Sequence, residues 1–477
     1  MRMTIDPLTA DRVSQLLSRL DVPGPRYTSY PTADRFVETF DAASYERALQ
    51  QRASEAAAGV GSKVAAPLSV YVHIPFCESI CHYCACNKVV TRQQARAGEY
   101  LQALQREIDL HLAVLRRGQP LTQLHVGSGS PTFLNDDELG QLMADLRAAF
   151  PIAPDAEVSI EVDPRTVDAH RLRHLAALGF NRLSFGVQDF DPEVQKAVHR
   201  DQPCEAVAAL MRVAREIGFE SIYADLIYGL PRQTPATFSH TIAQMGALRP
   251  DRIALYAYAH LPECFKPQRR IHAHELPTAG ERVHMLRAAI SGFQGLGYTH
   301  IGMDHFALPS DPLAVAKREG RLHRNLQGYS TQADCDLIGL GVSAIGKIGR
   351  CYSQNDKTLT SYYDAIGQSR FASVRGLVLT DDDLLRREVI MALMCQGRVD
   401  FDAVERAHPV RMRERFSVEL DRLRPLQTQG LVSLEPTAIQ VTPLCWYFVR
   451  AIAMVFDRHL APEAQRDPPL AGYSRVV

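Results

Sequence analysis

Short runs of β-branched and aromatic residues alternate with amphipathic stretches of helical length between residues 68 and about 260, and this alternation limits the fold most strongly. The predicted strands are 68–74, 123–127, 158–162, 182–185, 221–227 and 252–258. The predicted helices between them are 94–115, 136–149, 166–178, 204–217 and 237–248. Repeated strand-helix units predict a parallel sheet. Six units are too few for a closed eight-stranded barrel, so an open sheet and a partial barrel remain as alternatives.

In both architectures the loops after the carboxyl ends of the strands face one crevice, where chemistry is expected. The polar and glycine-bearing motifs of this region follow the strands in that way. They are a cysteine-rich loop after the first strand, Gly127-Ser-Gly-Ser130 after the second, Glu161 at the end of the third, Gly186-Val-Gln-Asp189 after the fourth, Asp225 in the fifth and Tyr258-Ala-His260 after the sixth. The pattern therefore predicts one site at this edge of the sheet.

The loop after the first strand carries four cysteines within ten residues, Cys77, Cys81, Cys84 and Cys86. Thiolates at these spacings can wrap three of the four irons of a cubane iron-sulfur cluster. The fourth iron is then open to the amino and carboxylate groups of a small molecule, and the methionine end of S-adenosylmethionine carries both. Cys86 is a ligand candidate too, but the single intervening residue makes it awkward for Cys84 and Cys86 to reach one cluster.

Structural zinc and disulfide bonds are the alternatives for this loop. Zinc sites usually repeat a two-residue gap and add a second ligand pair well downstream, whereas these cysteines are local, with gaps of three, two and one residues. The other cysteines are scattered singly, which suits a reducing cytosol and disfavours disulfide bonds. We expect them to be buried small apolar residues. They are Cys204, Cys264, Cys335, Cys351, Cys395 and Cys445.

The cysteine motif resembles that of radical S-adenosylmethionine enzymes, and more narrowly that of the oxygen-independent coproporphyrinogen III oxidases (coproporphyrinogen dehydrogenases) of haem biosynthesis. The resemblance rests on Cys-x3-Cys-x2-Cys with Tyr83 before the third cysteine, on Cys86-Asn-Lys88 and on Tyr71-Val-His-Ile-Pro-Phe76. It continues through residues 26–32, 186–189 and 322–329 to the C-terminal region, and so covers nearly the whole chain. It implies a partial, six-stranded barrel of the TIM type.

The resemblance also implies the cofactors. Cys77, Cys81 and Cys84 would hold a [4Fe-4S] cluster, while Cys86 would be important without being a cluster ligand. Two molecules of S-adenosylmethionine would be bound by residues around the strand ends, although a lone polar residue there is more often structural. These residues are Tyr71, Tyr83, Ser128, Gly129, Ser130, Glu161, Gln188, Arg200, Asp225, Ala259 and Ile345. The family usually has three glycines and a threonine at 127–130, so Ser128 and Ser130 are departures.

The implied reaction is a radical oxidative decarboxylation. A 5′-deoxyadenosyl radical removes a β-hydrogen from a propionate of coproporphyrinogen III, and loss of CO2 and an electron leaves a vinyl group; a second round gives protoporphyrinogen IX. An external electron donor such as a flavodoxin or ferredoxin is expected. Cations are expected to hold the substrate carboxylates. The candidates are Arg26 with Tyr27 on the N-terminal arm, and Lys266, Arg269, Arg270, His323 and Arg324. We interpret His73, beside the cysteine loop, as an inward-facing strand histidine and not as a ligand.

Three domains are expected: an N-terminal arm with a linker (1–67), the barrel with an extension (68–375) and a mostly helical C-terminal domain (376–477). The arm should contain one short helix near 11–20, an irregular proline-rich stretch at 22–31 and a linker near 56–66. Beyond Thr380, helices at 381–395, 401–408, 411–427 and 444–459 and a hairpin at 431–442 resemble a winged helix. We interpret this domain as a lid over the barrel mouth.

Charge and hydropathy limit the partners. The net charge is −1, and residues 381–460 hold 11 Lys and Arg against 12 Asp and Glu, which disfavours binding to nucleic acid. The sequence shows neither an apolar signal core nor an apolar run that could span a bilayer, so a cytoplasmic location is expected. A monomer is expected as well, although the sequence itself does not reveal the oligomeric state. A haem-binding chaperone of the same superfamily is the main alternative, but its relatives typically lack the Cys84-Ala-Cys86 ending and the Arg26–Pro31 segment. A DNA-binding iron-sulfur regulator is a third hypothesis.

Overall fold

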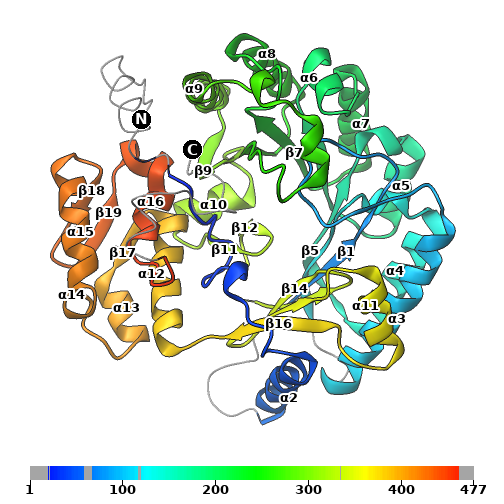
Figure 1. The fold of residues 1–477 in the computed structure, drawn as a ribbon, viewed down its shortest axis with the longest axis horizontal. Coiled ribbons are helices and arrows are strands. Elements are labelled where there is room, and N and C mark those ends of the chain that lie inside the picture. Colours follow the sequence, from blue (N-terminus) through cyan, green and yellow to red (C-terminus); the bar gives the residue numbers. More distant parts are fainter. Residues whose placement is uncertain (1–19, 21, 59–66, 116–119, 333–334, 461–477) are drawn as a thin grey trace.

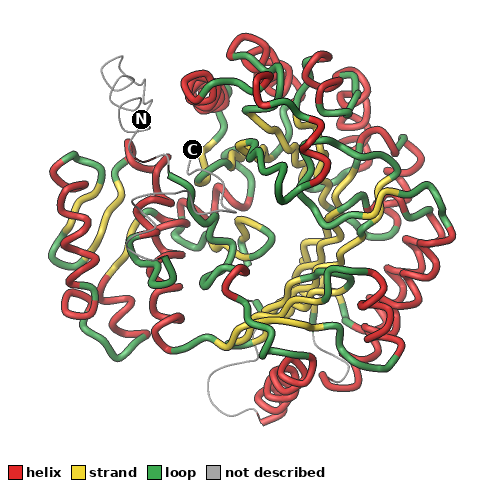
Figure 2. Tube along the Cα trace, in the orientation of Figure 1, coloured by secondary structure: helices red, strands yellow, loops and turns green. Residues whose placement is uncertain are grey.

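The computed structural model describes residues 20, 22–58, 67–115, 120–332 and 335–460. A strongly curved sheet carries helices on its outer side, and a smaller, mostly helical C-terminal unit lies beside its open side (Figures 1 and 2). The predicted helix near 11–20 and most of the predicted linker lie outside the described residues. No helix within the described ranges is long and apolar enough to cross a membrane.

The six predicted strands are confirmed, and they pair in parallel and in chain order. They are β1 (Leu68–Ile74), β4 (Leu121–Ser128), β5 (Ile152–Val162), β6 (Arg182–Gln188), β7 (Ser221–Tyr228) and β8 (Arg252–Ala257). Their alternate residues fill the main hydrophobic core, as Val70, Val126, Ile160, Leu183 and Leu226 are fully buried. Burial of both faces explains why these strands read as nearly continuous apolar runs.

The five predicted crossover helices are also confirmed, and they cover the outer face of the sheet together with α9 (Figure 1). They are α3 (Ala95–Leu115), α4 (Asp136–Ala149), α5 (Ala169–Ala177), α7 (Cys204–Ile217), α8 (Pro235–Leu248) and α9 (Ala279–Gly295), with the short α6 (Pro192–Ala197) after β6. Local sequence sets their ends: capping boxes at Asn135 and Thr234 begin α4 and α8, and Gly218 with a left-handed φ ends α7.

Beyond the six parallel strands the sheet continues at both edges, which the sequence did not predict. One edge adds β13 (Asp336–Leu340), parallel to β1, and then the antiparallel β14 (Ile345–Ile348), β15 (Cys351–Asn355) and β16 (Ser373–Val378). The other adds β10 (His305–Ala307) and β9 (Thr299–Gly302). The backbones of β13 and β14 pack closely, because a Cβ on Gly339 would lie 2.6 Å from the Ile345 carbonyl oxygen. The two outermost strands, β16 and β9, do not pair with each other within the described residues, so the barrel is partial.

The C-terminal unit has its own hydrophobic core, built on Val389, Leu393, Phe416 and Ile439. A Thr380/Asp383 capping box begins the first helix, as the sequence predicted. The elements are α12 (Asp381–Gln396), β17 (Arg398–Asp400), α13 (Phe401–Ala407), α14 (Met412–Arg415), α15 (Ser417–Thr428), β18 (Val432–Leu434), β19 (Ala438–Val441), the 3-10 helix η6 (Pro443–Phe448) and α16 (Val449–Met454). The predicted continuous helix over 444–459 is wrong, because a 3-10 turn precedes a much shorter α-helix.

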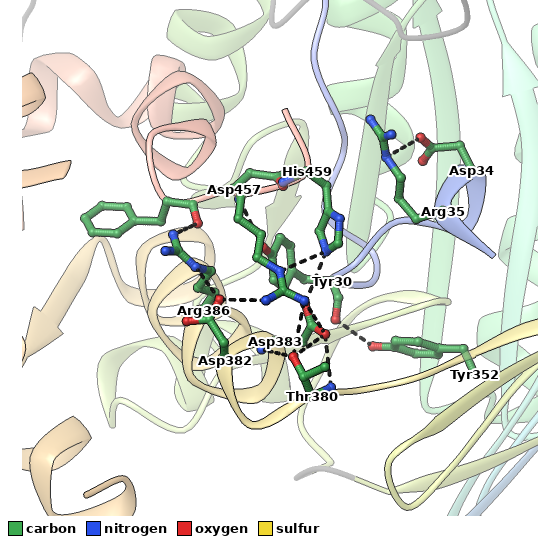
Figure 3. Close-up of polar contacts among 12 residues, drawn as sticks. Tyr30, Asp34, Arg35, Tyr352, Thr380, Asp382, Asp383, Arg386, Asp457 and His459 are labelled. Carbon is green, nitrogen blue, oxygen red and sulfur yellow. Dashed lines mark hydrogen bonds and ion pairs between the residues drawn. The ribbon is translucent and has the colours of Figure 1, made fainter. Parts of the chain in front are cut away.

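The N-terminal arm joins the two units. Tyr27 and Tyr30 are fully buried in the C-terminal core, and the Tyr27 hydroxyl donates to Asp457 at 3.0 Å. Figure 3 shows Tyr30 close to Asp457 and His459. After the 3-10 helix η1 (Ala33–Arg35), Val37 pairs with Gly376 of β16. The irregular stretch at 22–31 is confirmed, whereas α2 (Ala42–Ala58), which packs on α3, was missed.

Candidate functional site

A cavity of about 740 Å³ lies at the carboxyl ends of β1, β4 and β5. The arm forms one side of it through Arg26 and Tyr27, and the turn between β13 and β14 forms another through Ser343. Of the residues implied for cofactor binding, Tyr71, Ser128, Glu161, Ala259 and Ile345 line this cavity, together with Cys86. Tyr83, Gly129, Ser130, Gln188, Arg200 and Asp225 are not part of its wall.

The cysteine loop follows β1 and is held by the short parallel strands β2 (Phe76–Cys77) and β3 (Val89–Val90). Burial and the neighbouring Cys84 and Cys81 raise the pKa of Cys77 to about 12. The Cys86 thiol donates to Cys84, which lowers the pKa of Cys84 to about 6 and raises the pKa of Cys86. No group of three His, Cys, Asp or Glu side chains in the described ranges could hold a single metal ion.

Two arginines approach the sulfur of Cys81, which is buried. Arg200 Nη1 lies 3.4 Å and Arg165 Nη2 lies 3.7 Å from Cys81 Sγ. Cationic donors can compensate the negative charge of a sulfur that is bound to iron, so this environment fits a cluster ligand. Asp163 pairs with Arg165 at 2.7 Å and with Arg200 at 3.4 Å; although burial opposes the shift, both arginines lower the pKa of Asp163.

Asp163 and Arg165 were missed in the sequence, as was the role of Arg200 next to the cysteine loop. Asp163 does carry a local signal, because it follows β5 directly and caps the 3-10 helix η3 (Pro164–Thr166). Arg200 also donates to the Gly186 carbonyl oxygen at 2.6 Å. A Cβ on Gly186 would lie 2.9 Å from Arg200 Nη2, so a glycine is needed for this approach.

The glycine-bearing turn after β4 shows why the family usually has glycine at position 128. Ser128 has a φ of 88°, in the left-handed region that favours glycine. A Cβ on Gly129 would lie 2.7 Å from the Pro75 carbonyl carbon, so this position requires glycine. The buried Ser130 Oγ has no hydrogen-bond partner among the described residues. An orphaned hydroxyl in a tight glycine turn fits a site that a polar cofactor completes.

Asp225, on β7, has a raised pKa of about 7, because burial and the charge of Glu161 disfavour its ionised form. The Ser184 hydroxyl donates to it at 3.4 Å. Gln188, at the end of β6, has a φ of 70° and is buried. The backbone carbonyl of Tyr83 accepts from Gln268 at 2.9 Å, which ties the cysteine loop to the 3-10 helix η4 (Lys266–Arg270).

The polar wall of the cavity also contains a residue that the sequence analysis did not single out. His125, on β4, lies 3.2 Å from Glu161, and its ring stacks on Tyr71 at 5.8 Å with an interplanar angle of 16°. Glu161 also accepts from the Ser128 backbone N–H at 2.8 Å. His73 is buried, as expected for an inward strand histidine, and burial lowers its pKa to about 4.

The candidate substrate cations fall into two groups. Arg26 lies on the cavity wall, forms an ion pair with Asp304 and stacks over the Tyr256 ring at 5.1 Å; Arg324, on β11 (His323–Asn325), donates to the Arg26 carbonyl oxygen at 3.2 Å. Lys266, Arg269, Arg270 and His323 are not on the cavity wall. The first three belong to η4, where Arg270 lies 3.4 Å from His82 of the cysteine loop.

The expectation for the scattered cysteines is partly wrong. Cys335, Cys395 and Cys445 are buried and Cys204 and Cys351 are half-buried, whereas Cys264 is exposed on the loop after β8. That loop is irregular and lies near the surface, where an isolated small residue needs no apolar partner.

Comparison with known families matches residues 71–245 to the radical SAM superfamily and residues 379–448 to the HemN C-terminal domain. The chain is 46% identical over 462 residues to the oxygen-independent coproporphyrinogen III oxidase of Escherichia coli (strain K12), covering 97% of this chain and 98% of the relative. It is 44% identical over 466 residues to the enzyme of that name from Pseudomonas aeruginosa, covering 97% and 98%.

The solved structure of coproporphyrinogen III oxidase (HemN) from Escherichia coli, described as a radical SAM enzyme, superposes on the fold with a TM-score of 0.87. The two chains are 47% identical, and the alignment covers 91% of this chain and 98% of the other. The match therefore includes the partial barrel and the C-terminal unit together.

Proposed function

Because this chain belongs to the family of oxygen-independent coproporphyrinogen III oxidases, we propose that it converts coproporphyrinogen III to protoporphyrinogen IX by radical oxidative decarboxylation of two propionate side chains. The observation that carries the proposal is the match of the whole chain to these enzymes, with the cavity at the strand ends where this fold places its chemistry. The haem-binding chaperone is not favoured by these relatives.

As a radical SAM enzyme the protein uses a [4Fe-4S] cluster and S-adenosylmethionine, which together supply a carbon radical that can abstract hydrogen. Cys77, Cys81 and Cys84 hold the cluster in this proposal, and Arg165 and Arg200 favour the anionic sulfur of Cys81. Cys86 lies on the cavity wall and donates to Cys84, which supports a role beside the substrate and not as a fourth ligand.

Two molecules of S-adenosylmethionine are proposed, because the implied residues occupy two neighbouring regions. Tyr71, Ser128, Glu161, Ala259 and Ile345 face the cavity. Tyr83, Gly129, Ser130, Gln188, Arg200 and Asp225 lie around the cysteine loop and the ends of β4, β6 and β7, outside that wall. The unpartnered Ser130 hydroxyl belongs to the second region, so each region has polar groups of its own to offer.

The substrate carboxylates are proposed to bind at the arm side of the cavity. Arg26 faces the cavity with its side chain 30% exposed, and Asp304 neutralises one cation there. The buried Arg324 adds a second cation, and its Nη1 has no hydrogen-bond partner among the described residues. A buried excess of positive charge is costly unless an anion compensates it, which favours a polycarboxylate ligand.

The electron donor and the assembly state are proposals too. Lys266, Arg269 and Arg270 form a basic 3-10 helix that contacts the cysteine loop, which supports an acidic one-electron donor such as a flavodoxin or ferredoxin docking near it. We also propose that the protein acts in the cytoplasm, as a monomer, without nucleic acid or membrane.

An anaerobic turnover assay tests the function. Cluster-reconstituted protein is given a reductant, S-adenosylmethionine and coproporphyrinogen III, and 5′-deoxyadenosine and tetrapyrrole products are followed together. We expect both to rise, with a vinyl-bearing product, in wild-type protein but not in Cys81→Ala. Formation of 5′-deoxyadenosine without a vinyl product would reject the substrate while keeping the radical chemistry.

A further inference from the structure

His125 lies at the centre of a small hydrogen-bonded group on the cavity wall. Its Nε2 lies 3.2 Å from Glu161 Oε1, and its Nδ1 lies 2.6 Å from the Ser159 hydroxyl. The imidazole side chain is 19% exposed and that of Glu161 is 39% exposed, so both still reach the cavity. The imidazole ring of His125 stacks on the ring of Tyr71.

Two hydrogen bonds fix the ring of His125. An ionised carboxylate only accepts hydrogen bonds, so Nε2 must carry the proton that it donates to Glu161. Nδ1 forms the second contact, at 2.6 Å to the Ser159 hydroxyl, and that hydroxyl donates to the Leu124 carbonyl oxygen at 3.3 Å. The orientation of His125 is therefore fixed by its own strand neighbourhood.

Both oxygens of Glu161 are held in this way. Oε1 accepts from His125, and Oε2 accepts from the Ser128 backbone N–H at 2.8 Å. Gly127 makes the arrangement sterically feasible, because a Cβ there would lie 2.7 Å from Glu161 Oε1 and 2.8 Å from His125 Nε2. The remaining lone pairs of the carboxylate are free to accept from a ligand in the cavity.

We propose that His125 is a positioning residue that fixes the Glu161 carboxylate to accept hydrogen bonds from the ribose hydroxyls of S-adenosylmethionine. The inference rests on the proposed function, since it assigns the cavity to that cofactor. Two fixed carboxylate oxygens suit a pair of neighbouring hydroxyls, and the stack of His125 on Tyr71 keeps that side of the wall rigid. His125 acts through Glu161 and not through the reacting atoms.

A double-mutant cycle tests the coupling. The dissociation constant of S-adenosylmethionine is measured by anaerobic equilibrium dialysis on cluster-reconstituted wild type, His125→Phe, Glu161→Gln and the double variant, with iron content determined for each. Phenylalanine keeps the aromatic stack and removes the donor. We expect His125→Phe to weaken binding roughly 10- to 150-fold, as for one hydrogen bond to a charged group. The double variant should bind no more weakly than Glu161→Gln.

Two controls keep the test decisive. His125→Gln retains an N–H donor without the ring and should recover most of the affinity. His170→Phe removes an exposed histidine that lies 3.7 Å from Asp136, and should bind as wild type does. If the increases in dissociation constant caused by His125→Phe and Glu161→Gln multiplied in the double variant, the role of His125 would be refuted and the proposed function would stand. Wild-type affinity in His125→Phe would have the same consequence. If wild-type protein bound no S-adenosylmethionine, the proposed function would fail first.

Discussion

Replacing Glu107 by glutamine should change the stability of the protein in a pH-dependent way. Glu107, on α3, is fully buried, and no cation among the described residues is recorded as pairing with it. Its carboxylate accepts from the Gly341 N–H at 2.7 Å, from the Asn355 amide at 2.7 Å and from the Tyr362 hydroxyl at 2.8 Å. Because Gly341 begins the turn that leads to Ser343 and Ile345 on the cavity wall, Glu107 connects the outer helix layer to the site.

The sign follows from the pKa. Burial raises the pKa of Glu107 from 4.5 to about 7, so the folded state binds more protons than the unfolded state between these values. The contribution of Glu107 to the free energy of unfolding therefore falls as pH rises from 4.5 to 7, by about 3 kcal/mol at 1.36 kcal/mol per pH unit. Glutamine has no charge to bury. Its amide N–H, however, faces one of the three groups that donate to Glu107, and that donor loses its acceptor, which costs about 1–3 kcal/mol at any pH.

The free energy of unfolding of wild type minus that of Glu107→Gln should consequently be largest near pH 5 and smaller by about 3 kcal/mol at pH 8. Urea unfolding of cluster-free protein at both pH values, followed by far-UV circular dichroism, gives the difference while the other titrating groups cancel. Hydrogen exchange of residues 337–348 should speed up in the variant at both pH values. A difference that stayed constant or grew with pH would refute the argument, because Glu107 would then ionise as an ordinary surface carboxyl does.

Three further predictions follow from the site. Alanine at Cys77, Cys81 or Cys84 should abolish the visible absorption of the reconstituted cluster, whereas Cys86→Ala should keep it; cluster loss in Cys86→Ala would restore that residue as a ligand. Ser128→Gly should raise the free energy of unfolding by up to about 1 kcal/mol, seen as a higher melting temperature, because it relieves the strain at a φ of 88°, whereas Ser128→Ala should not. Asp304→Asn should lose roughly 3 kcal/mol of stability, because Arg26 loses its carboxylate partner, without changing the affinity for S-adenosylmethionine. Although burial opposes the shift, Arg26 holds the pKa of Asp304 well below its usual range. The loss of stability in Asp304→Asn should therefore be constant above about pH 4 and vanish in stronger acid. A loss of stability that set in near neutral pH would contradict the pairing.

The parallel half of the fold could be predicted because its signals are local. Each strand such as β1 is a run of buried residues, and each crossover helix shows its own period and caps. The added strands carry no such signal: β14 has four residues and its identity depends on pairing with β13 and β15. The missed helix α2, however, is rich in alanine, glutamine and glutamate, and helix propensity alone would have identified it.

The candidate site also has a part that the sequence predicted and a part that it did not. The spacing of Cys77, Cys81 and Cys84 is visible in ten residues, and the family resemblance supplied the residues around it. The sequence could not show which polar groups meet. Arg26 and Asp304 are 278 residues apart, and His125 is one of several polar residues in β4. Such pairs are set by the register of neighbouring strands, so His125 faces Glu161 only because β4 and β5 are aligned as they are.

The docking of the arm also determines when the site can exist. The Tyr27 hydroxyl and the Asp457 carboxylate that accepts its hydrogen bond are separated by 430 residues, and Arg458 donates its backbone N–H to Tyr30. During synthesis the barrel strands emerge and can pair first, while the arm has no core to enter until the C-terminal unit follows. The arm-facing wall of the cavity is therefore finished last, and completion of the polypeptide precedes completion of the active site.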